Sequence, residues 1–300
     1  MPTRIIMRPT ATAMTASTRI NRLAAPPSAE LRAAFERRGE ATVMTEKYHT
    51  APVKIAKTFP LGSSIGAIVM DVSPGMLDGD HYELEWKCGP GSRLLVTNQS
   101  FTKVHPAGPL GGASLKQTFV LGAEAVAEHM PEPIMLYKDA AFVSETDVHL
   151  APGSVWMQAD VWCPGRTLRG ERFLYTRFDS RLAVWYGGER IGAQRQWIEP
   201  AAQAIRAPGC FADATHIGTL LVYGDRLGAA ELEAAREAIG ALPDRSAYGV
   251  TAGASLTYRY GLAVMAAGTA AWPLQEALRA AWRAVRLSLL GEEPPALLRV

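Results

Sequence analysis

The sequence predicts a mainly β protein of antiparallel or coiled sheets, with two helices near its C-terminal end. Between about residue 41 and residue 225, short runs rich in β-branched and aromatic residues alternate with Gly and Pro. These runs recur roughly every ten residues. No helical pattern lies between them, which argues against a βαβ fold. No self-similar repeat of fixed length is present, so the sequence contains no repeated motif that would encode a solenoid.

The predicted strands are Ala41–Thr50, Val53–Phe59, Ser64–Val72, Tyr82–Trp86, Arg93–Thr97, Ser114–Val120, Val155–Trp162, Phe173–Phe178 and Arg181–Tyr186, with a further pair in Val250–Val264. The segment 28–38 is ambiguous. Its Ala, Leu, Glu and Arg favour a helix, whereas Leu31, Ala33 and Phe35 alternate as in a strand.

Two C-terminal segments have helical periodicity. Ala229–Leu242 carries one apolar stripe and is followed by a proline. In Trp272–Leu290, Pro273 suits the first helical position and Gly291 marks the end. The apolar face of this second helix consists of Leu274, Leu278, Trp282, Val285 and Leu289.

Composition narrows the class of protein. The 300 residues fit two average domains or one large β domain, and hydrophobic residues at 48% can form a sizeable core. A net charge of +2 argues against a general nucleic-acid binder. No apolar run is long enough to span a membrane. Three widely spaced cysteines, Cys88, Cys163 and Cys210, fit a reducing compartment, so we expect a cytoplasmic protein without disulfides.

Residues 1–28 differ from the rest of the chain. Acidic residues are absent from residues 1–29, where four arginines stand among Thr and Ser, as in an organelle transit peptide. The stretch has neither the amphipathic periodicity of a transit helix nor the apolar core of a secretory signal. We therefore predict a disordered tail over 1–28 and one domain over 29–300.

Enzymatic signatures are absent. The chain contains no GxxxxGK[ST], HExxH, GxSxG or strand-linked GxGxxG motif. Its six histidines are scattered, and no two have the spacing of a metal-binding pair. We therefore expect no catalytic activity and no tightly bound cofactor.

Two acidic turns stand out, in residues 74–80 and 165–171. Each places a carboxylate, Asp80 or Glu171, directly after a glycine at the start of a predicted strand. A hairpin turn with a polar rim accounts for such a pattern without any function.

Five motifs in the same order resemble the urease accessory D family (UreD/UreH), from about residue 30 to the C-terminus. They are the glycine-rich turn at Ser73–Asp80, the run Leu95–Val104, the segment Glu128–Pro133, the stretch Gly165–Phe173 and the closing pattern Trp282–Gly291. Asp78, His105 and His129 depart from the residues usual in that family. The resemblance implies layered, coiled, β-helix-like sheets with a small helical region. It also favours a strand at Leu31–Arg37.

The resemblance further implies a role in urease maturation. Members of this family bind the F accessory protein, which recruits the GTP-hydrolysing G protein, and the assembly docks on apo-urease and supports nickel insertion. The resemblance also implies that Ni²⁺ in transit passes through the interior of the protein. Such a conduit must hold the ion weakly, and isolated carboxylates do so better than a cage of Cys and His. We expect Asp80, Glu132 and Glu171, and to a lesser degree Asp78, to line or gate this path.

Two other functions stay open. Long β chains include carbohydrate-active hydrolases, in which Asp80 and Glu171 would form an acid/base pair. Alternatively, the chain is a β binding module that handles no metal, and its turn carboxylates are surface caps.

Overall fold

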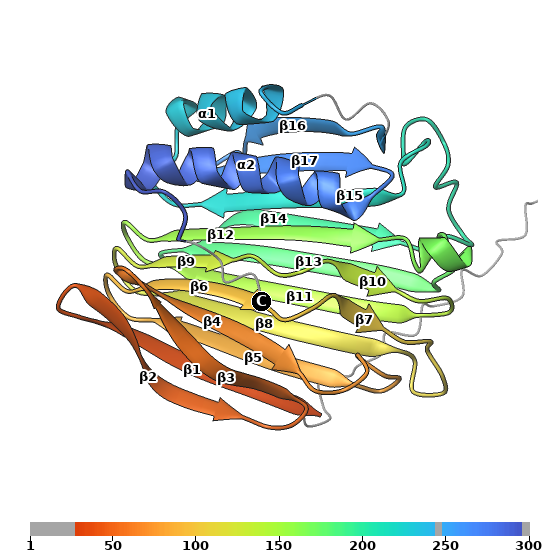
Figure 1. Cartoon of the computed structure of the whole chain (residues 1–300), viewed down its shortest axis with the longest axis horizontal. Coiled ribbons are helices and arrows are strands. Elements are labelled where there is room, and N and C mark those ends of the chain that lie inside the picture. Colours follow the sequence, from red (N-terminus) through yellow and green to blue (C-terminus); the bar gives the residue numbers. More distant parts are fainter. Residues whose placement is uncertain (1–27, 244–247, 296–300) are drawn as a thin grey trace, which may run out of the picture.

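The computed structural model describes residues 28–243 and 248–295, and it confirms a mainly β architecture with two helices. Residues 1–27 of the predicted tail lie outside the described residues. Figure 1 shows the strands stacked in two layers, with both helices beside the layer that contains β15 and β17. Within the described part of the chain, no helix is long and apolar enough to cross a lipid bilayer.

The smaller sheet has seven strands. Their order is β14 (Glu189–Ile198), β13 (Arg177–Tyr186), β11 (Ala141–Leu150), β8 (Ala113–Leu121), β5 (His81–Cys88), β1 (Ala29–Arg38) and β2 (Ala41–His49). The strands from β1 to β13 along this order are parallel to one another, whereas β2 and β14 close the two edges as antiparallel partners.

The larger sheet has ten strands. Eight follow in the order β16 (Thr251–Leu256), β17 (Gly261–Gly268), β15 (His216–Tyr223), β12 (Val155–Cys163), β9 (Val126–His129), β6 (Arg93–Asn98), β4 (Ser64–Asp71) and β3 (Val53–Leu61). The short strands β10 (Ile134–Leu136) and β7 (Thr102–Val104) extend this sheet beside β12.

The chain coils between the two sheets. From β5 to β13 it visits them alternately, so each turn of the coil adds one strand to the smaller sheet and one or two to the larger. Neighbouring turns pair in parallel and without register shifts. Since side chains alternate between the faces of a strand, equivalent residues of successive turns form rows across each sheet. These rows build the interior.

The first described strand, β1, forms although the composition of its residues favours a helix. In β1, residues Ala29, Leu31, Ala33 and Phe35 are buried and alternate with more exposed residues, as a strand with one face on the core requires. One predicted strand, Phe173–Phe178, is wrong over most of its length. Phe173 has φ of +57°, and β13 begins only at Arg177 and continues through the separately predicted Arg181–Tyr186.

Both predicted helices are confirmed, as α1 (Ala229–Gly240) and α2 (Ala271–Leu290). Pro273 is the third residue of α2 and not the first as predicted. Its missing N–H is tolerated because the first-turn N–H groups of a helix have no partner within it. Gly291 ends α2 in the left-handed conformation, at φ of +70°, and its N–H donates to Leu287 at 2.9 Å.

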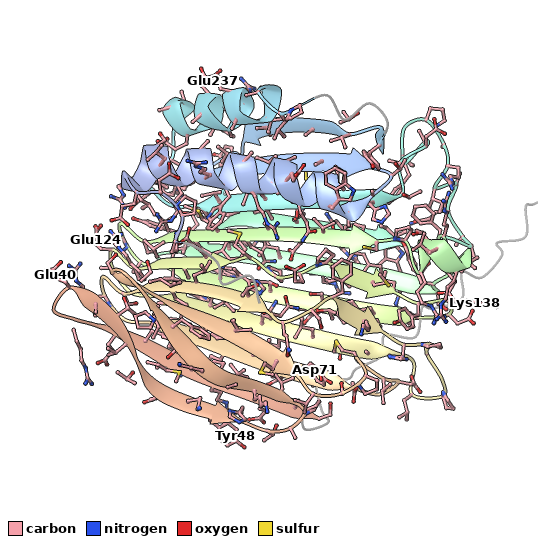
Figure 2. The ribbon with its side chains drawn as sticks, in the orientation of Figure 1. Glu40, Tyr48, Asp71, Glu124, Lys138 and Glu237 are labelled. Atoms are coloured by element: carbon pink, nitrogen blue, oxygen red, sulfur yellow. The ribbon has the colours of Figure 1, made fainter. Side chains whose placement is uncertain are left out.

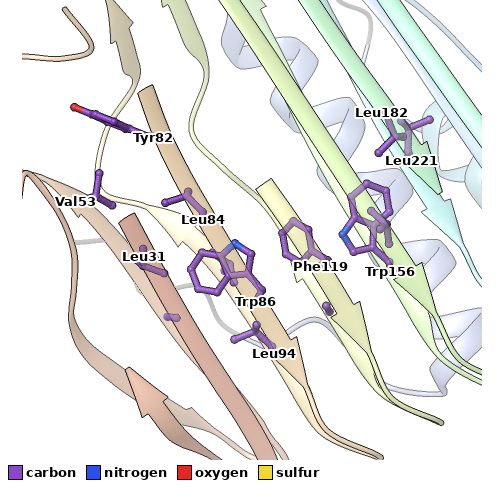
Figure 3. Packing of buried hydrophobic residues seen from close by; sticks show 14 of the residues in the cluster. Leu31, Val53, Tyr82, Leu84, Trp86, Leu94, Phe119, Trp156, Leu182 and Leu221 are labelled. Atoms are coloured by element: carbon purple, nitrogen blue, oxygen red, sulfur yellow. The ribbon is translucent and has the colours of Figure 1, made fainter. Parts of the chain in front are cut away.

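Two hydrophobic cores hold the layers together. One lies between the sheets and includes Trp86, Phe119 and Trp156, whose rings are neighbours in Figure 3. The ring centroids of Phe119 lie 6.2 Å from Trp86 and 5.9 Å from Trp156. The second core lies between the larger sheet and the helices and contains the buried face of α2, including Leu274 and Leu278. Each such leucine contributes about 1.5–3 kcal/mol on burial.

Candidate functional site

A cavity of about 150 Å³ lies between the two sheets, with room for several water molecules. Its lining comes from strands of both sheets and from the loop that follows β4. The inter-sheet space is therefore not filled by apolar side chains along its whole length. The side chains that line this cavity determine which ligands it can bind.

On the smaller sheet, two neighbouring rows contribute polar side chains to the cavity. One row contains Ser144, Ser180 and Gln196, and the next contains Gln117, Thr146 and Gln194. The rows exist because consecutive turns place the same inward position on β8, β11 and β13, and the antiparallel edge strand β14 continues each row. The two rows thus form a belt of hydroxyl and amide groups, interrupted by Leu115 and Leu182, and Arg181 also contributes to this wall. Each hydroxyl and amide group can offer an oxygen atom to a ligand.

Aromatic rows border this belt on both sides. Trp86 and Phe119 form one border, and Phe142 and Phe178, stacked with ring centroids 6.3 Å apart, form the other. A polar belt between two apolar borders runs across the strands. The same geometry keeps the cavity aligned with the axis along which the turns of the coil stack.

The facing wall carries a hydrogen-bonded chain of three side chains on β9 and β12. Nδ1 of His129 donates to Oε1 of Gln158 at 2.9 Å, and Nε2 of Gln158 donates to Oδ2 of Asp160 at 2.5 Å. Burial lowers the pKa of His129 and raises the pKa of Asp160, because a low-dielectric surrounding disfavours both charged forms. The neutral imidazole, protonated at Nδ1, carries its lone pair on Nε2.

A second carboxylate lines the cavity beside the loop after β4. Oδ1 of Asp71 accepts from the N–H and the hydroxyl of Ser73, at 2.9 and 2.6 Å, and Oη of Tyr82 donates to Oδ2 of Asp71 at 3.4 Å. Burial raises the pKa of Tyr82, and the negative charges of Asp71 and Asp80 add to this effect. Asp80 therefore lies within electrostatic reach of the lining, although it is not part of it.

Three of the four carboxylates expected on the nickel path hold loops at one end of the coil. Asp78 accepts from the N–H groups of Leu110 and Gly112, at 2.9 and 2.6 Å, and Asp80 accepts from the N–H of Leu77 at 2.7 Å. Figure 2 shows Lys138 at this end and Glu124 at the opposite one.

Glu171 lies at the same end, where it accepts from Nε of Arg166 at 2.8 Å and from the N–H of Lys138 at 3.3 Å. The Arg166 guanidinium lowers the pKa of Glu171, whereas a general acid needs a raised one. The ion pair with Arg166 therefore favours a structural role for Glu171 over that of a general acid.

Glu132 lies apart from the other three, against α2. Its carboxylate accepts from Nε2 of Gln275 at 3.2 Å and lies 3.7 Å from the guanidinium of Arg279. The lining of the cavity includes none of the four expected residues. Within residues 28–243 and 248–295, no three His, Cys, Asp or Glu side chains form a group able to hold a metal ion. Contact of the four carboxylates with nickel therefore stays a prediction.

Sequence reasoning overlooked the residues that line the cavity, although β12 contains a signal. Trp156, Gln158, Asp160 and Trp162 share one face of this strand, and the two polar residues interrupt an apolar face at core positions. Polar residues at the core positions of a strand are either hydrogen-bonded or in contact with water. Here both occur.

Comparison of the sequence with known proteins identifies its family. A sequence model of the family described as UreD urease accessory protein matches residues 27–300. The chain is 29% identical to the urease accessory protein UreD of Acetivibrio thermocellus, over 79% of this chain and 89% of that protein. It is 31% identical to UreD of Haloarcula marismortui, over 87% of both chains, and 32% identical to UreD of Natronomonas pharaonis, over 85% of both. The chain belongs to the UreD family of urease accessory proteins.

Proposed function

We propose that this urease accessory protein is a cytoplasmic scaffold without catalytic activity that passes Ni²⁺ through the cavity between its sheets. In this proposal it bridges apo-urease to the F accessory protein and, through F, to the G GTPase. Nickel is cargo and not a resident cofactor. The observation that carries the proposal is the chemistry of the cavity wall.

The wall offers single donors spaced along a path. Serine and threonine hydroxyls, amide oxygens, Asp71, Asp160 and one imidazole face the same space. Divalent nickel binds strongly to clustered imidazole and thiolate ligands, whereas isolated oxygens hold it weakly. A conduit needs contacts that admit the ion and still release it. The cavity therefore fits the requirement of a conduit better than that of a storage site.

The burial of Asp160 adds to this weakness. Burial raises the pKa of Asp160, because a low-dielectric surrounding disfavours its charged form. A cation binds the charged form of a carboxylate, so the same desolvation opposes binding of the ion at this point.

The test is the substitution Asp160→Asn, which keeps the size of the side chain and its capacity to accept from Gln158. We expect this variant to form the same complex with F, G and apo-urease but to reduce nickel-dependent urease activation several-fold. Asp147→Asn is the matched control, because Asp147 is on β11 of the smaller sheet with its side chain on the face away from the cavity. Full activation by Asp160→Asn would refute passage through this cavity.

Bridging is tested separately by pull-down of F, G and apo-urease with the wild-type chain. Loss of G when F is omitted supports the proposed order of contacts. Retention of G without F contradicts it. If the wild-type chain and the Asp160→Asn variant both form the complex but neither supports nickel-dependent urease activation, the chain is instead a binding module that handles no metal.

The four carboxylates at the surface keep a place in the proposal as points of brief contact outside the cavity. Asp80 is the strongest of them, because its charge reaches Tyr82 in the lining. The double substitution Asp80→Ala and Glu171→Ala tests this group, and full urease maturation by that variant would remove it from the path.

A further inference from the structure

The wall segment, residues 128–132, has two faces with different partners. His129 and Pro131 line the cavity. Met130 belongs to the second core beneath the helices, and Glu128 and Glu132 both contact side chains of α2. This short piece of backbone therefore separates the proposed nickel path from one helix on the outside of the sheet.

The first contact with α2 is a buried ion pair. Arg286 and Glu128 are 1% and 2% exposed, and Nε of Arg286 lies 3.0 and 3.2 Å from the two carboxylate oxygens. Nε1 of Trp282 donates to the same carboxylate at 2.7 Å. A buried charge with this many partners has little freedom to change position, because each displacement leaves a polar group unpaired.

The second contact lies four residues further along the chain. The Glu132 carboxylate receives Gln275 and faces Arg279, while its backbone N–H donates to Oδ1 of Asn98 at 2.5 Å. Asn98 itself lines the cavity. The two contacts follow in opposite order along α2, because Gln275 and Arg279, which lie one helical turn apart and meet Glu132, precede the residues that meet Glu128.

We propose that α2 clamps the wall segment from outside and thereby sets the position of His129 in the cavity. Glu128 and Glu132 are the positioning residues of this clamp, and Gln275, Arg279, Trp282 and Arg286 are its counterparts on the helix. The proposal rests on nickel passage through the cavity. It assigns Glu132 a role in holding the wall, and it makes α2 the element through which an outside contact reaches the path.

The two halves of the clamp differ in accessibility. The Glu128 half is enclosed, whereas the side chain of Arg279 is 43% exposed and that of Glu132 is 32% exposed. A protein that binds along α2 can compete for Arg279 without unfolding the helix. The Glu132 half is therefore the adjustable one, and it can be altered without disturbing the core.

The test combines Gln275→Ala with Arg279→Ala in the full-length chain and measures backbone hydrogen exchange in residues 128–132. We expect the amides of Met130 and Glu132 to exchange about 5-fold faster, which is the effect of losing about 1 kcal/mol of local stabilisation. The control is Arg283→Ala, on the same helix, because Arg283 pairs with Glu293 and not with the wall segment. Equal exchange in all three proteins would overturn the clamp.

Urease activation supplies the second readout. A clamp that positions His129 predicts reduced nickel-dependent activation by the Gln275/Arg279 variant and wild-type activation by Arg283→Ala. Faster exchange with unchanged activation overturns the positioning role. The Asp160→Asn variant distinguishes an error in the proposed clamp from an error in the proposed nickel path. If it too activates fully, passage through the cavity is wrong; if it fails while the helix variant activates fully, only the clamp is wrong.

Discussion

Removing the buried cation of α2 gives the sharpest prediction about stability. In Arg286→Met, the side chain keeps a similar apolar stem but loses the guanidinium. Glu128, at 2% exposure, then retains the indole N–H of Trp282 as its remaining donor at 2.7 Å. The carbonyl groups of Glu292 and Glu293 also lose the Arg286 N–H groups that lie 2.9 and 2.5 Å away.

The expected loss is about 3–5 kcal/mol, the range for removing one partner of a buried ion pair. A folded domain is stable by about 5–15 kcal/mol, so this single change removes a large part of the total. Most of the loss comes from the carboxylate that stays buried. Hence neutralising it should recover stability, and the double variant Glu128→Gln, Arg286→Met should be more stable than Arg286→Met alone.

The effect is measured by urea unfolding of the wild type, Arg286→Met, Glu128→Gln and the double variant, which together form a double-mutant cycle. With a slope of about 3 kcal/mol per molar urea, the midpoint of Arg286→Met should fall by about 1 M or more. Arg283→Met is the control on the exposed side of α2, and its effect should stay within about 0.5 kcal/mol. A loss below about 1 kcal/mol for Arg286→Met, or a double variant weaker than it, would refute the reasoning.

Two further predictions concern pH and backbone strain. Burial lowers the pKa of His216 to about 4, so as the pH falls below the ordinary value near 6.5 the unfolded chain takes up a proton that the folded chain does not. Stability should therefore decline between about pH 6.5 and pH 4, by about 3 kcal/mol from this group. Urea unfolding across this range should show a shallower decline for His216→Gln, and an identical decline would contradict the assignment. In Gly112→Ala, the new Cβ would lie 2.1 Å from the carbonyl oxygen of Ala141 at φ of +98°, so we expect a loss of about 3 kcal/mol or more. Gly187→Ala, at φ of +57° and in open space, should lose only about 1 kcal/mol, and equal thermal shifts for the two variants would contradict the steric argument.

The mainly β class, most strands and both helices were predictable because they depend on local periodicity. The i, i+4 stripe of Leu274, Leu278 and Trp282 indicated α2. The segment that forms β1 was ambiguous on local pattern, and only the resemblance to the family favoured a strand there. The misjudged segment at Phe173–Phe178 has the composition of a strand, but its backbone turns at Phe173, whose N–H donates to Pro164 at 2.8 Å. Composition carries no information on such a contact.

The candidate site was less predictable, because it is produced by stacking. Asp160 and His129 are 31 positions apart in the sequence, and they approach only because β9 and β12 pair in parallel. The turn carboxylates Asp80 and Glu171 attracted attention through the glycines before them, yet those glycines also suit loops in which both side chains bind backbone N–H groups. A polar residue on the core face of a strand is the better signal, as Asp160 illustrates.

The central claim, that Ni²⁺ enters the cavity between the sheets and is held there only briefly, is tested most directly by paramagnetic broadening. Methyl signals of Thr146 and Thr219, which line the cavity, are compared with that of Thr118, on the outer face of the smaller sheet, as Ni²⁺ is added to the full-length protein. The account predicts progressive broadening of the two cavity signals in fast exchange, and its loss in Asp160→Asn. Broadening confined to Thr118 or other outer positions, or a cavity signal in slow exchange with tightly bound nickel, would contradict it.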